Sequence, residues 1–118
     1  MNVSQSSQEH QKELAQELRR IVPILRDEYQ AEKIIAFGSF VLGNINIWSD
    51  LDIAIIKPTS ARFLDRLLEV NRLVGPGVSS DLLVYTPKEF DEMSQTNIFV
   101  QEEIIKKGKV LYDKNKSL

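Results

Sequence analysis

Residues 33–56 read KIIAFGSFVLGNINIWSDLDIAII and contain the features that decide the fold. The run over 33–37 is short, nearly all apolar and stopped by Gly38, which is typical of a buried strand. The run over 50–56 has the same character and ends before Pro58, because proline cannot continue a β-ladder. We therefore predict two buried strands, with a glycine after the first and two aspartates at the start of the second.

The rest of the chain alternates helical and strand patterns. Apolar residues recur at three- and four-residue steps from Glu9 to Leu25, which predicts an amphipathic helix that Pro23 either kinks near Arg19 or divides into two. The other predicted elements are a short helix over 39–42, a helix over 63–74, a strand over 78–85, a helix begun by the capping box at 86–89, a helix over 98–105 and a strand over 109–112. This order predicts one α/β domain with a central sheet.

Length and composition fit one small domain. The 118 residues are 42% apolar and 27% charged, which is ordinary for a chain with a buried core. We expect a flexible N-terminus over 1–12, the domain itself over 13–113 and a flexible tail over 114–118.

Composition also excludes several kinds of site. The chain has no cysteine and a single histidine, His10. This excludes disulfides, thiolate zinc sites and cysteine catalysis, and argues against a Ser-His-Asp triad. We expect His10 itself to have no role. The net charge of −2 argues against a broad basic surface, so we expect no direct nucleic-acid binding. There is no secretory signal and no membrane-length apolar run, so we expect a cytoplasmic protein.

Three aspartates carry the candidate chemistry. Asp50 and Asp52 are two residues apart on the predicted strand, so their side chains project from one face. Two adjacent carboxylates repel each other, and a divalent cation such as Mg²⁺, which prefers oxygen ligands, resolves that conflict. Asp81 begins the next strand and lies across from this pair if the two strands are neighbours. Three carboxylates around a triphosphate suit two-metal phosphoryl or nucleotidyl transfer.

Gly38 and Ser39 form a candidate phosphate site at the end of the first strand. We expect Ser39 to cap the short helix, and its hydroxyl and the nearby backbone amides to bind phosphate. The simpler alternatives stay open: surface aspartates at 50 and 52, a turn residue at 81, and a serine that only caps.

Three apolar side chains lie between these motifs. We expect Phe40 and Leu42 to pack the short helix against the sheet. Trp48 is expected either to cover the core, as isolated tryptophans commonly do, or to stack on a nucleobase.

Gly38-Ser39, ten further residues, then Asp50-Leu51-Asp52 and a later Asp81 together resemble the DNA polymerase beta superfamily of nucleotidyltransferases. The short length resembles the smallest branch, the minimal nucleotidyltransferases often encoded beside a HEPN-domain protein in bacteria and archaea. The resemblance covers residues 33 to 112 and implies a polymerase-beta-like α/β (α+β) fold with a small mixed sheet flanked by helices. One departure is Leu42, where family members commonly carry an arginine able to grip phosphate.

The resemblance also implies a mechanism. Asp50 and Asp52 would bind two Mg²⁺ ions, and Asp81 would complete the first metal site and help to deprotonate the acceptor hydroxyl. Gly38 and Ser39 would hold the β- and γ-phosphates of a nucleoside triphosphate, with ATP as the implied substrate.

The partner implied by the resemblance is a HEPN-domain toxin. Transfer of AMP to a tyrosine of that toxin would make this chain the antitoxin of a type VII-like toxin–antitoxin pair, in a homo- or hetero-oligomer. Two alternatives remain: a non-catalytic antitoxin that neutralises by binding alone, and nucleotidyl transfer to a small molecule or an RNA end.

Overall fold

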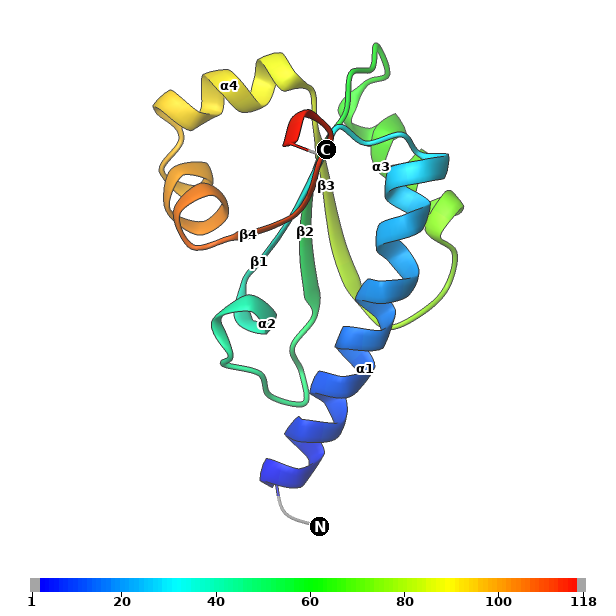
Figure 1. Ribbon diagram of the computed structural model, residues 1–118, viewed down its shortest axis with the longest axis vertical. Helices are drawn as coiled ribbons and strands as arrows, with labels where there is room; N and C mark the ends of the chain where they lie inside the picture. Colours follow the sequence, from blue (N-terminus) through cyan, green and yellow to red (C-terminus); the bar gives the residue numbers. More distant parts are fainter. Residues whose placement is uncertain (1–2, 117–118) are drawn as a thin grey trace.

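The computed structural model describes residues 3–116 and confirms an α/β fold around one four-stranded sheet. The strands are β1 (Lys33–Phe37), β2 (Leu51–Ile56), β3 (Ser80–Tyr85) and β4 (Lys109–Asp113). Their order is β3-β2-β1-β4, so β3 and β4 are the edge strands (Figure 1). The sheet is mixed, because β1 is antiparallel to β2 and β4 whereas β2 and β3 are parallel.

Helices cover both faces of this sheet (Figure 1). One face packs against α1 (Val3–Pro23), the π-helical turn η1 (Ile24–Glu28) and α3 (Phe63–Val74). The other face packs against α4 (Pro87–Thr96) and the π-helix η2 (Val100–Lys106). Two short helices, α2 (Ser39–Leu42) and η3 (Lys114–Lys116), follow β1 and β4. The side chains of β2 therefore alternate between two separate apolar layers.

The first helix has the amphipathic stripe that the sequence predicts. Leu14, Ile21 and Leu25 are fully buried against the sheet. The helix begins at Val3 instead of Glu9, and the chain stays helical through Pro23 and continues as the wider π-helix η1. Pro23 therefore does not separate two helices. Residues 3–12 are helical, while the flexibility expected for the two ends of the chain stays a prediction. No helix within residues 3–116 is long and apolar enough to span a membrane.

Most other predicted elements are confirmed with small shifts. α3 has the predicted bounds, and α4 begins with the predicted capping box, in which the Thr86 hydroxyl accepts from the Glu89 amide and the Glu89 carboxylate from the Thr86 amide. β2 begins at Leu51, one residue after Asp50, and β3 begins at Ser80. The helix predicted over 98–105 is the π-helix η2.

An ion pair between a buried arginine and a partly exposed glutamate joins α3 to the start of α4. The Arg66 side chain is only 7% exposed and donates two hydrogen bonds to the Glu89 carboxylate, at 2.7 and 3.2 Å. It also donates to the carbonyls of Ala61 and Val84. The Arg66 guanidinium lowers the pKa of Glu89 and has its own pKa raised by the same contact.

Arg66→Ala is expected to lower the free energy of unfolding by about 2–4 kcal/mol, because a buried carbonyl and a partly buried carboxylate lose their donor. Urea denaturation at neutral pH measures this loss. The control is Arg62→Ala, which removes an exposed pair with Asp65 and should change stability by less than about 1 kcal/mol. Equal losses in the two variants would contradict the role assigned to Arg66.

Candidate active site

Asp52 and Asp81 lie side by side on parallel strands. Asp52 of β2 is the register partner of Asp81 of β3, and the Asp81 carboxyl group lies close enough to raise the pKa of Asp52. The sequence predicts that Asp52 and Asp81 lie across from each other only if β2 and β3 are neighbours. The strand order confirms that they are. Residue alternation places both side chains on the sheet face that carries α4 and η2. Asp50 precedes β2 by one residue and adds its charge from that end.

This arrangement makes Asp52 hard to ionise. Burial raises its pKa, and the negative charges of Asp81 and Asp50 raise it further, to about 6. A carboxyl group that titrates near neutral pH is able to take up and release a proton under ordinary conditions. Strongly perturbed carboxyl groups of this kind occur most often at functional sites.

Gly38 brings the turn after β1 directly against Asp52. Its φ of +81° and ψ of −160° belong to a region that residues with side chains rarely occupy. A Cβ at this position would overlap the Oδ2 atom of Asp52. The glycine is therefore needed both for the backbone conformation and for the close approach of the two motifs that the sequence singled out.

Ser39 does not cap the short helix, contrary to the prediction. It is the first residue of α2, Gly38 occupies the N-cap position, and no side chain accepts a capping hydrogen bond there. No described residue bonds to the Ser39 hydroxyl. That hydroxyl is consequently free to contact a ligand, one residue after the glycine that approaches Asp52.

Two apolar residues near the site are more exposed than predicted. Phe40 packs partly against the core, as expected, but Leu42 is 46% exposed and Trp48 is 82% exposed. Trp48 therefore does not cover the core. Stacking of Trp48 on a nucleobase, the other alternative, stays a prediction. The loop after α2 is held by hydrogen bonds that the Trp48 amide donates to Asn46 Oδ1 and the Asn46 amide donates to Ser49 Oγ.

His10 takes part in positioning this loop, although the sequence suggested no role for it. Its Nε2 atom lies 2.6 Å from the carbonyl oxygen of Ser49, the residue before Asp50. The contact joins α1 to the segment that leads into β2. Only the tertiary fold reveals it, because the two residues are distant in the sequence.

A hollow of about 550 Å³ opens next to the aspartates, and most of its wall was not foreseen from the sequence. Phe37 and Phe99 meet edge to face there, with ring centroids 5.8 Å apart. Leu67 and Asn71 reach the hollow from α3. The complete lining is Phe37, Asp52, Leu67, Asn71, Ser80, Asp81, Leu82, Leu83 and Phe99. One feature of the sequence could have indicated this wall, namely the polar Asn71 within the apolar stripe of a predicted helix.

The donor atoms at this site fit a hard divalent cation. Asp50, Asp52 and Asp81 offer only carboxylate oxygens, the ligands that Mg²⁺ prefers, and the charges of Asp81 and Asp50 both raise the pKa of Asp52. Between residues 3 and 116, no three acidic or histidine side chains already form a metal-binding group.

Comparisons with known proteins identify the family of this chain. The family described as "Polymerase beta, Nucleotidyltransferase" matches residues 19–117, a span that contains all five predicted site residues. The crystal structure of a candidate nucleotidyltransferase from Sulfolobus solfataricus has the same fold, with a TM-score of 0.66 and 21% identity over 96% of this chain and 92% of that chain. No curated protein matches this sequence significantly. The chain therefore belongs to the polymerase beta nucleotidyltransferase family, whose general activity is nucleotidyl transfer from a nucleoside triphosphate with a divalent metal.

Proposed function

We propose that this chain transfers AMP from ATP to a tyrosine hydroxyl of a partner protein, a HEPN-domain toxin, and acts as the antitoxin of that pair. The observation that carries the proposal is the Asp52–Asp81 pair, with the Gly38 turn pressed against it. The pair supplies carboxylate oxygens for metal binding and proton transfer, and the turn supplies a stretch of backbone without a side chain next to them. Family membership supports nucleotidyl transfer, and the small size of the chain favours an acceptor that brings its own binding surface.

Asp50, Asp52 and Asp81 are the residues that would hold the metal ions. When bound, two Mg²⁺ ions lower the pKa of the acceptor oxygen and neutralise the charge of the leaving phosphates. Gly38 and Ser39 would hold the β- and γ-phosphates, where the free Ser39 hydroxyl is able to donate a hydrogen bond.

The proposed reaction exchanges a phosphoanhydride bond of ATP for a phosphoester bond to the acceptor. The acceptor oxygen attacks the α-phosphorus of ATP and its proton passes to Asp81, which is exposed and is the register partner of Asp52. A new bond joins the acceptor oxygen to the α-phosphorus, while the bond from that phosphorus to the oxygen that bridges it to the β-phosphorus breaks. The electron pair of the broken bond leaves with pyrophosphate.

Neutralisation by binding alone is the second candidate, and Leu42 favours it. The side chain at this position is apolar and 46% exposed, whereas an arginine there would grip phosphate oxygens in a bidentate way. Because position 42 carries no cation, we expect a lower affinity for ATP.

Leu42→Arg is expected to lower the KM for ATP by about three- to tenfold, because a charge-assisted hydrogen bond to phosphate is added at an exposed position. Steady-state transfer at varied ATP concentration measures this change. Leu42→Met is the matched control, since it keeps an apolar side chain without charge. An unchanged KM in Leu42→Arg would show that residue 42 does not face the phosphates.

Neutralisation in cells separates the two candidate functions. The protein encoded by the adjacent gene is co-expressed with this chain, or with a variant that carries both Asp50→Asn and Asp52→Asn, and growth and the intact mass of the partner are recorded. Catalysis predicts that the mass of one AMP group appears on the partner, and that both the added mass and growth are lost in the double variant. Growth that persists with the double variant, without added mass, would instead establish neutralisation by binding.

A further inference from the structure

The outer edge of β3 carries unused backbone hydrogen-bonding groups beside the aspartates. Leu51 donates its amide to the Ser79 carbonyl and Lys57 to the Tyr85 carbonyl, so the odd-numbered residues of this segment face β2. In a parallel pair the groups of successive residues point alternately toward and away from the neighbouring strand. The amides and carbonyls of Ser80, Leu82 and Val84 therefore point outward from the sheet.

Among the described residues, only some of the outward amides and carbonyls of β3 have a hydrogen-bond partner. The Val84 carbonyl accepts a hydrogen bond from the buried Arg66 side chain at 3.3 Å. No described residue forms a hydrogen bond with the outward groups of Ser80 or Leu82. These two residues also line the hollow next to Asp81. The open stretch of edge is thus short and lies at the candidate active site.

Exposed apolar side chains border this open edge on both sides. On α3, Leu67 and the polar Asn71 line the hollow, and the neighbouring apolar residues Leu64 and Leu68 at helical spacing are 71% and 62% exposed. Phe99 and its exposed neighbour Ile98 stand on the other side. An extended peptide uses backbone groups and apolar pockets together when it adds to a sheet edge.

We infer that the acceptor protein docks on this edge as an extended segment, which pairs its backbone with Ser80 and Leu82 and places its hydroxyl-bearing residue next to Asp81. The inference rests on the proposed function, because it requires a protein acceptor. Side chains of an added strand alternate between the two faces, as those of β3 do. The acceptor residue lies on the Asp81 and Phe99 side, so the residues directly before and after it contact Leu64 and Leu68 and are apolar.

The first test is kinetic and uses the partner protein described above as acceptor. Leu64→Asp and Leu68→Asp each place a charge on the α3 border, at an exposed position that does not line the hollow. Each is expected to raise the KM for the partner about tenfold or more, with kcat and the KM for ATP within about twofold of the unchanged protein. The matched control is Val110→Asp, which places the same charge on an exposed apolar position of β4, the opposite edge.

The second test follows amide hydrogen exchange of this chain with and without the partner. Slower exchange at Ser80 and Leu82 in the complex, together with the raised KM, supports edge docking. Active transfer with unchanged KM in both α3 variants overturns the docking while the proposed function stands. If no transfer occurs but Ser80 and Leu82 exchange more slowly in the complex, the proposed function is overturned and the edge docking stands. If there is neither transfer nor slower exchange, the proposed function and the docking are both overturned. Protection of these amides in this chain alone at high concentration would assign the edge to a second copy and overturn the inference.

Discussion

Asp52→Asn is expected to abolish nucleotidyl transfer and, at neutral pH, to make the folded chain more stable. Asparagine keeps the size of the side chain but loses one negative charge and one proton-accepting oxygen, at the position where β2 meets both β3 and the Gly38 turn. Loss of a group at the reacting centre lowers kcat by about three orders of magnitude. Transfer of radiolabel from the α-phosphate of ATP to the acceptor measures this loss.

The gain in stability follows from the raised pKa of Asp52. The folded-state pKa is about 6 against an ordinary value of 3.8, so between these pH values the folded state binds more protons than the unfolded state. The free energy of unfolding therefore falls as the pH rises through this window and then stays level. Because the side chain is partly exposed, we expect the ionised Asp52 to destabilise the fold by about 1–2 kcal/mol at pH 7.5.

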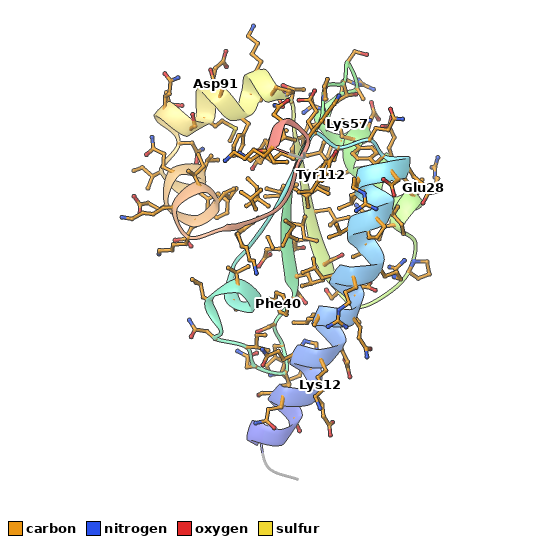
Figure 2. All side chains as sticks on the ribbon, in the orientation of Figure 1. Lys12, Glu28, Phe40, Lys57, Asp91 and Tyr112 are labelled. Carbon is orange, nitrogen blue, oxygen red and sulfur yellow. The ribbon has the colours of Figure 1, made fainter. Side chains whose placement is uncertain are left out.

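Urea denaturation at two pH values checks this result. Asp52→Asn should be about 1–2 kcal/mol more stable than the unchanged chain at pH 7.5, with little difference at pH 3.5, where both carry a neutral group. Asp91→Asn is the control, since Asp91 is exposed on α4 at the opposite end of the sheet from Phe40 of α2 (Figure 2). A variant less stable than the unchanged chain at pH 7.5 would contradict the electrostatic account of the site.

Gly38→Ala should affect both folding and activity. The backbone at Gly38 lies in a region that favours glycine, and the added Cβ would overlap Asp52 Oδ2. We expect a loss of about 2–3 kcal/mol in the free energy of unfolding, from backbone strain and displacement of the carboxylate. Transfer should fall by about 10²-fold, because the turn and the carboxylate no longer meet in the productive geometry.

Gly43→Ala separates backbone strain from the overlap. Gly43 also has a positive φ, +79°, but a Cβ there would meet nothing within 4 Å. This control should lose about 1 kcal/mol of stability and little activity. Combining Gly38→Ala with Asp52→Ala should recover part of the lost stability, because the overlapping carboxylate is gone. Equal losses of stability and activity in Gly38→Ala and Gly43→Ala would show that the close approach of Gly38 to Asp52 contributes to neither.

The strands and the meeting of the aspartates were predictable because local signals specify them. Short apolar runs stopped by glycine or proline mark β1 and β2, and the Thr86 capping box marks the start of α4. The contact of Asp52 with Asp81 needed one further fact, the neighbouring position of β2 and β3, which the sequence left as a condition and the structure confirms.

The remaining features depend on long-range packing, and the sequence did not reveal them. Trp48 is exposed on the loop after α2, which no local pattern signals. The walls of the hollow come from α3 and from the segment before η2, so Asn71 and Phe99 meet the aspartates only in three dimensions. The open backbone edge at Ser80 depends on strand order, because it exists only when no strand follows β3 in the sheet.

One experiment tests the central claim most directly: transfer of radiolabelled AMP from ATP to the adjacent-gene product in the presence of Mg²⁺, with the unchanged chain, Asp52→Asn and Asp91→Asn compared side by side. The account predicts label on the partner with the unchanged chain and with Asp91→Asn, and none above background with Asp52→Asn. Equal labelling by all three chains would show that the Asp52–Asp81 pair is not the site of transfer. Absence of label with every nucleotide and divalent metal, in a complex that still forms, would contradict catalysis and leave neutralisation by binding.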